Sequence, residues 1–109
     1  MADAFKILGQ ADLAATTLTD VYTVPAATEA VISAIVICER AGTATTFRVA
    51  LAPNGAANAN SHYLYYDTDI PANETFIASI GATIDATDVV RVYAGTGDIT
   101  ATVLGMEIT

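Results

Sequence analysis

The sequence predicts a single all-β domain, folded as one antiparallel β-sandwich of about eight strands. Three observations favour this fold class. Turn-forming residues recur at intervals of about 8–12 residues, apolar and polar residues alternate between them, and no stretch of helical length shows a 3.6-residue apolar period. The 109 residues suit one domain, 1–109, without a linker or an internal repeat. The strand pattern fits a jelly roll and an immunoglobulin-like sandwich equally well.

The first half of the chain contains four expected strands. Segment 29–40 is apolar on both faces between residues 30 and 38, which is typical of a central strand covered on both sides. In segment 45–52, Phe47, Val49 and Leu51 share one face. The four strands cover residues 4–8, 20–24, 29–40 and 45–52, and they end at turn signals in residues 9–10, 25–28, 41–43 and 53–55.

The second half begins with a small, polar segment, residues 52–61, that we expect to be an exposed loop. Near the C-terminus, Leu104, Met106 and Ile108 alternate with other residues, as in a strand with one apolar face. The four strands cover residues 62–66, 75–80, 89–94 and 100–108, separated by turn signals in residues 70–73, at Gly81 and in residues 95–97.

Composition limits the classes of partner. The net charge of −8, from 12 acidic and 4 basic residues, argues against nucleic acid and anionic membranes as partners. Small side chains dominate, with 22 Ala and 16 Thr, and they suit faces covered by a neighbouring subunit because they lose little rotamer entropy on burial. The chain shows no secretory signal and no apolar run of about 20 residues, so we expect a soluble protein made in a cytoplasm.

No constellation of residues supports catalysis. Cys38, the only cysteine, lies in the most apolar segment and is expected to pack as a small buried hydrophobe. His62, the only histidine, is expected to be exposed or at an interface. Asp67 and Asp69 have the one-residue gap of some calcium loops, but Pro71 breaks the EF-hand pattern, so a cation site and plain turn residues both stay open. We expect no enzymatic activity and no cofactor.

Tyrosines around segment 62–66 are the first candidates for a contact surface. Strict alternation places Tyr63 and Tyr65 on one face of this strand and Tyr66 on the other, with His62 and Leu64. Tyrosine is enriched at interfaces because it buries apolar area and keeps a polar tip. The candidate interface residues here are His62, Tyr63, Tyr65, Tyr66 and Tyr93, and packing at the edge of the core is an equally good interpretation.

Arginines are the second candidates. Arg40, Arg48 and Arg91 lie in or beside expected strands of an acidic protein with few cations. They are candidates for ion pairs with the acids of a neighbouring subunit. A local cross-strand pair is at least as good an interpretation.

Several segments resemble small virion proteins of tailed bacteriophages. LTDVYTVPA (18–26), EAVISAIVIC (29–38) and GTATTFRVA (42–50) are similar to the patterns TxLYTVPA, AVVSxIxVCN and GTATTFRVAV of that family. KILGQ (6–10), ATDVVRVYA (86–94) and GMEIT (105–109) fit the same pattern, so the resemblance spans nearly the whole chain. Glu29 and the pair Glu39-Arg40 depart from it and make the strand ends more charged.

The resemblance implies a structural component of a phage particle. We expect a capsid decoration (cement) protein that binds copies of itself, in a homo-oligomer such as a trimer, and other virion proteins such as the major capsid protein. It would be made in the host bacterial cytoplasm and located in the virion. A neck, collar, baseplate or fibre-attachment component of the tail is the first alternative. A host-surface or carbohydrate-binding module, using segment 62–66 and the loop before it, is the second.

Overall fold

A computed structural model describes residues 4–108 of the protein. Within this range the chain forms eight β-strands, all paired antiparallel, and two short 3-10 turns, without an α-helix. The elements are β1 (Ala4–Leu13), β2 (Leu18–Thr23), β3 (Glu29–Glu39), β4 (Thr45–Ala52), η1 (Pro53–Gly55), η2 (Asn60–His62), β5 (Tyr63–Ile70), β6 (Thr75–Ile84), β7 (Val89–Ala94) and β8 (Ile99–Ile108).

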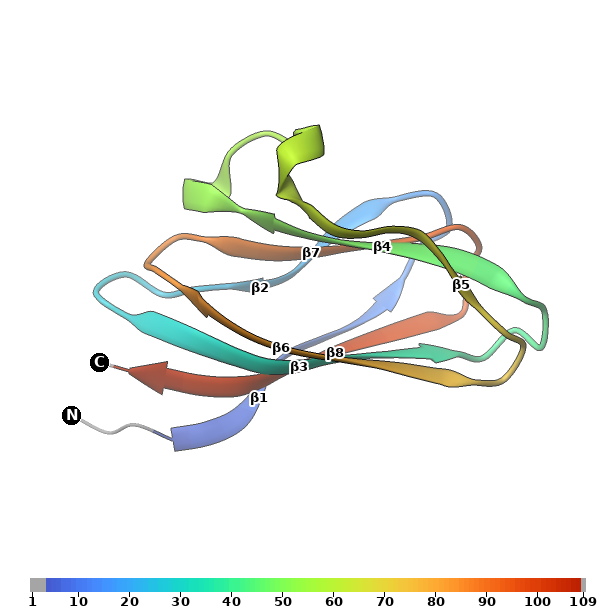
Figure 1. Cartoon of the computed structure of the whole chain (residues 1–109), viewed down its shortest axis with the longest axis horizontal. Helices are drawn as coiled ribbons and strands as arrows, with labels where there is room; N and C mark the ends of the chain where they lie inside the picture. Colours follow the sequence, from blue (N-terminus) through green and yellow to red (C-terminus); the bar gives the residue numbers. More distant parts are fainter. Residues whose placement is uncertain (1–3, 109) are drawn as a thin grey trace.

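The strands pair as the two arms of one long hairpin. β4 pairs with β5 at its tip, and β3 with β6, β2 with β7 and β1 with β8 follow outward along the arms. The hairpin is rolled into two packed sheets, sheet A in the order β1-β8-β3-β6 and sheet B in the order β2-β7-β4-β5 (Figure 1). Eight strands in this arrangement form a jelly roll. The predicted antiparallel sandwich is confirmed, and its topology is not the immunoglobulin-like one.

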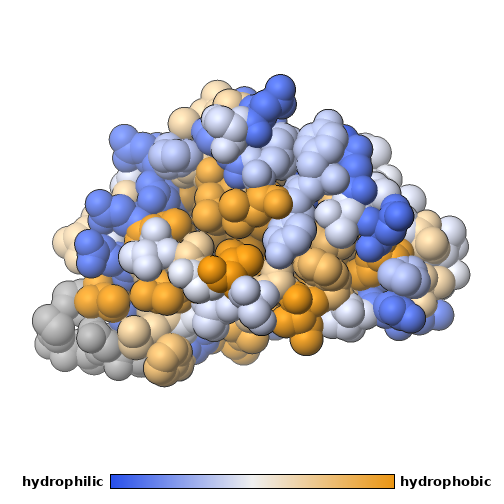
Figure 2. Space-filling view, in the orientation of Figure 1, coloured by the Kyte–Doolittle hydropathy of each residue, from blue (hydrophilic) through white to orange (hydrophobic). Residues whose placement is uncertain are grey.

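The core lies between the two sheets. Ile32, Ile35 and Ile37 of β3 are fully buried, and so are Phe47 and Val49 of β4, two of the residues predicted to share one face of that strand. Aromatic rings from β5 and β6 pack around Phe47. In the space-filling view, apolar side chains appear in the band between the sheets, whereas polar ones gather over the upper, sheet B side (Figure 2).

Two strands run through glycines that the sequence suggested as breakers. β1 continues past Gly9 and β6 past Gly81, so the predicted strand ends near these glycines are wrong. Each glycine lies at a bulge, which inserts a residue without ending the ladder. A Cβ atom on Gly9 would lie 2.2 Å from the carbonyl oxygen of Val21, because β1 and β2 approach closely there. Gly81 has a φ of +56°, which glycine adopts without strain.

Glu39 ends β3 inside the molecule, with a relative exposure of only 2%. Its carboxylate accepts hydrogen bonds from the backbone N–H groups of Asn73 at 2.9 Å, Ala41 at 2.9 Å and Gly42 at 3.0 Å. These donors, first that of Asn73, hold the pKa of Glu39 below its ordinary value of 4.5. The carboxylate therefore ties the β3–β4 loop to the β5–β6 loop, instead of adding charge to an exposed strand end.

Glu107 links the two sheets near the other end of the sandwich. It pairs with Lys6 of β1 at 2.8 Å and accepts a hydrogen bond from the Tyr22 hydroxyl of β2 at 2.7 Å. Lys6, and secondarily Tyr22, lowers the pKa of Glu107, while burial and the Glu107 carboxylate raise the pKa of Tyr22. The outermost strands of the two sheets are thus joined by a polar contact across the edge of the core.

Candidate interaction surfaces

Bulges in β5 decide where its tyrosines point. Relative to β4, this strand has one irregularity at Leu64 and a second at Tyr66 and Asp67. Alternation therefore fails, and Tyr63 and Tyr66 meet edge to face with ring centroids 4.9 Å apart. Tyr65 points into the core instead. The predicted grouping of Tyr63 with Tyr65 on one face is wrong, because each bulge moves the following residues to the other face.

Arg48 lies at the centre of the aromatic residues on the outer face of sheet B. Its guanidinium is stacked between the rings of Tyr66 and Tyr93, 4.1 Å and 4.3 Å from their centroids. Its Nε donates to the carboxylate of Asp67 at 2.6 Å, and this carboxylate raises the pKa of Arg48. We call these four residues the Arg48 cluster. The bulge at Tyr66 and Asp67 makes it possible, since it turns both residues toward Arg48.

The β4–β5 connection, residues 53–62, covers the rest of this face, and we call it the cover loop. Figure 1 shows it standing over β4 and β7. Arg91 of β7 holds it by donating to the carbonyl oxygen of Ala56 at 2.7 Å. Beneath the loop, Ala50 and Ala52 have no exposed surface although they point away from the core. Segment 52–61 is thus a loop, as predicted, but it also closes the outer face of sheet B.

Five of the eight predicted interface residues therefore come together on the outer face of sheet B, namely Arg48, Tyr63, Tyr66, Arg91 and Tyr93. The other three are separate. Tyr65 packs against Phe47 and Phe76 in the core. His62 is half-buried at the end of η2, with a buried Nδ1 atom that has no hydrogen-bond partner. Arg40 follows β3 of the opposite sheet.

Every basic side chain of the sequence has a carboxylate partner within the chain. The three arginines take the local alternative that the sequence left open. Arg48 and Arg91 pair with acids of adjacent strands, whereas the Arg40–Asp12 pair reaches from the end of β3 across β8 to β1. The pairs are Lys6–Glu107 at 2.8 Å, Arg40–Asp12 at 2.5 Å, Arg48–Asp67 at 2.6 Å and Arg91–Asp20 at 2.8 Å.

Sheet A has a very different outer face. Registers across its strands place Met106 between Phe5 and Val31, and Leu104 between Ile7 and Ala34. Phe5 is 77% exposed, Ile7 55% and Ile77 61%. The cover loop lies over sheet B only (Figure 1), so the outward side chains of sheet A are not covered by it. We call this surface the apolar face; it consists of Phe5, Ile7, Val31, Ala34, Val36, Cys38, Ile77, Leu104 and Met106.

The apolar face overturns one prediction about β3. The apolar run 30–38 does form a central strand, but only its inner face is covered. Val36 and Cys38 point outward and are only partly buried, so Cys38 is not the buried hydrophobe that the sequence suggested. The signal for the apolar face is the run itself, because a strand that is apolar on both sides needs cover on both sides.

Charged residues flank the apolar face at its two ends. Glu29 stands at one end, where exposed Asp85 follows β6, and Arg40 paired with Asp12 stands at the other, where exposed Glu74 precedes β6. Between them the outward positions hold apolar residues, threonines, serines and Gln10, whose amide donates to Thr102. Most of the 12 acidic residues of the protein therefore lie outside the apolar face.

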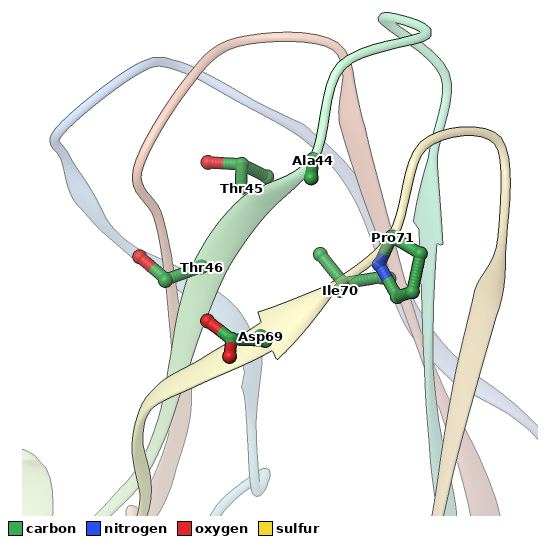
Figure 3. A pocket seen from close by; sticks show the side chains of 6 residues that line it. All are labelled: Ala44, Thr45, Thr46, Asp69, Ile70 and Pro71. Atoms are coloured by element: carbon green, nitrogen blue, oxygen red, sulfur yellow. The ribbon is translucent and has the colours of Figure 1, made fainter.

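Two shallow hollows also lie on the surface. One of about 440 Å³ lies between the start of β4 and the end of β5, with Asp69 beside Thr46 on the neighbouring strand (Figure 3). The other, of about 340 Å³, is lined by Asn60, Tyr63 and Tyr66. Asp67 and Asp69 belong to β5 and are not turn residues. Among residues 4–108, no three His, Cys, Asp or Glu side chains are grouped to hold a metal ion.

Comparison with known proteins leaves the family open: no family model matches the chain, and no curated protein matches its sequence. Within the part of the chain that the structure describes, no helix is long and apolar enough to cross a membrane.

Proposed function

We propose that the chain is a structural protein of a bacteriophage particle, in the first place a capsid decoration protein, that acts by surface contact and catalyses no reaction. The apolar face carries this proposal, because a contiguous exposed apolar surface marks a site of protein contact. The jelly roll agrees with it, since viral capsid domains use this architecture, although lectins and cupins use it too. The assignment to a bacteriophage particle rests on the resemblance of segments 18–26, 29–38 and 42–50 to phage virion proteins.

Adhesion follows from the exposed side chains. Each of Phe5, Ile7 and Ile77 would contribute about 1.5–3 kcal/mol if a neighbour buried it fully. A contact made only in the assembled shell stabilises that shell by mass action, and repetition over a lattice multiplies the effect. The proposed partners are further copies of the chain, in a homo-oligomer, and other virion proteins such as the major capsid protein.

Particles purified from infected cells test the proposal. Gold-labelled antibody should mark the shell, and quantitative mass spectrometry should count hundreds of copies per particle. Ile77→Lys should reduce the number of bound copies, whereas Leu64→Lys, at a 45% exposed apolar residue of sheet B, should leave it unchanged. Labelling of the tail, with about a dozen copies, would replace decoration by a neck, collar, baseplate or fibre role. Absence from washed particles would refute a virion role.

A second candidate, a host-surface or carbohydrate-binding module, is favoured by the 340 Å³ hollow. Its lining offers the ring of Tyr66, which is 57% exposed, and the amide of Asn60. An aromatic ring beside an amide suits the apolar and hydroxyl-bearing sides of a sugar. Binding on a glycan array that Tyr66→Ala removes would support this candidate. An array without binding would reject it.

A further inference from the structure

We propose that the apolar face binds the apolar face of a second copy of this chain, so that the working unit is a face-to-face pair. This inference rests on the proposed function, since it names the first partner of the same surface. It goes further by fixing which side of the protein is used up within the pair and which side is left for other contacts.

Charge selects a second copy as the occupant. Two copies that each carry a net charge of −8 repel one another in most orientations. Contact through the centre of the apolar face avoids opposing acids, because Glu29, Asp85 and Glu74 lie only at its ends and Asp12 is paired with Arg40. A strongly basic partner would gain little here, since the centre of the face offers it no carboxylate.

The area of the face is sufficient. Four strands about 4.8 Å apart, each about ten residues long at about 3.3 Å per residue, form a face of roughly 600 Å². A pair would bury about 1,200 Å² in total, the lower end of the range for stable interfaces. Identical surfaces related by a two-fold axis are complementary by construction and close after two copies. The pair would be a stack of four sheets, with the two A sheets inside.

The pair has a consequence for adhesion. Because the two A sheets face inward, both copies turn the Arg48 cluster and the cover loop outward, on opposite sides of the unit. Such a unit has two identical outer surfaces and could bridge two neighbours. A single chain offers only one. Tyr63, Tyr66 and Tyr93 would then lie on these outer surfaces, while the apolar face would hold the pair together.

Sedimentation velocity of the full-length chain tests the pair, with the native Cys38 thiol as a reporter of the face. We expect a concentration-dependent dimer in the unmodified protein. If only the monomer reacts, labelling of Cys38 by a maleimide should slow about tenfold when nine-tenths of the chains are paired. Cys38 is the only cysteine, so the labelling signal has a single source.

Ile77→Lys and Leu104→Lys should give monomers whose Cys38 reacts at one rate at all concentrations. Both changes lower the net negative charge and so weaken the repulsion between two copies, which by itself favours the dimer. A loss of dimers would therefore come from the apolar face and not from the change in net charge. Leu64→Lys makes the same charge change on sheet B and should still form dimers. Circular dichroism and thermal melts of each variant verify that it is folded.

A protein that stays monomeric at its highest soluble concentration would overturn the pair. So would a dimer in which Cys38 is labelled as fast as in the monomer, since the contact would then lie elsewhere. Neither result bears on whether the chain occurs in particles, because antibody labelling and copy number decide that separately. Conversely, a pair in solution would stand even if the chain were absent from particles.

Discussion

The two outer faces of the sandwich differ in whether the chain itself completes them. On sheet B the cover loop and the Arg48 cluster lie over the strands, and Ala50 and Ala52 are fully buried. On sheet A the outward residues are mostly apolar, yet Phe5 and Ile77 remain mostly exposed. The comparison indicates that burial outside the core is a property of the loops. Sheet A has no such loop, so burial of its outward apolar side chains requires a partner.

The largest expected effect contrasts two arginines. Arg91→Ala should lower the free energy of unfolding by about 3 kcal/mol, because the carbonyl oxygens of Gly55 and Ala56 and the Asp20 carboxylate lose their donor beneath the cover loop. Arg40→Ala breaks a more exposed pair with Asp12 on sheet A and should cost less than about 1 kcal/mol. Urea unfolding of both variants measures the difference. Equal losses would show that the loop does not depend on Arg91.

Two alanines at outward positions give the next contrast. Ala50→Leu should destabilise the chain by about 2 kcal/mol, because the cover loop leaves no room for a larger side chain. Ala34→Leu, at an outward position of β3, should change stability by less than about 0.5 kcal/mol. Thermal melts of dilute protein test both. If Ala50→Leu were neutral, the loop would be displaced easily and the contrast between the faces would be weaker.

The smallest expected effect concerns Glu39, which lies between the two sheets. Because its folded pKa is lowered from 4.5 by the N–H groups of Asn73, Ala41 and Gly42, the unfolded chain binds its proton more readily. Its contribution is therefore complete above pH 4.5 and is lost as the pH falls through the lower folded pKa. Glu39→Gln should lower the Tm at pH 7 by about 5 °C and flatten the decline below pH 4.5.

Melting curves from pH 7 to pH 3, followed by circular dichroism, measure this dependence. Glu74→Gln, at an exposed glutamate, serves as the matched control and should follow the unmodified protein. Coinciding curves for Glu39→Gln and Glu74→Gln would contradict the role given to the buried carboxylate.

Sequence reasoning succeeded where one residue type has a local consequence. Alternation in segment 45–52 predicts the bounds of β4 and the residues that share its apolar face, and the turn residues around segment 89–94 predict β7. It failed at Gly9 and Gly81, and in β5, because a bulge and a break have the same local signature. Whether the ladder resumes depends on the partner strand, which lies far away in the sequence.

The candidate surfaces show the same division. Sequence reasoning named Arg48, Tyr66 and Tyr93, yet their meeting around one guanidinium requires the pairing of β4 with β5 and β7. It missed the apolar face, although the run 30–38 signals it. Composition alone does not tell which of two apolar sides a neighbouring sheet will cover.

The sequence by itself determined the all-β class, the net negative charge and a central strand that is apolar on both sides. These follow from local periodicity, turn residues and charge, which act within a few residues. The tertiary structure decided the jelly-roll order of the strands, the burial of Glu39 and the contrast between the covered sheet B and the open sheet A. Those features depend on contacts between residues far apart in the chain, and only the folded arrangement of the strands brings them together.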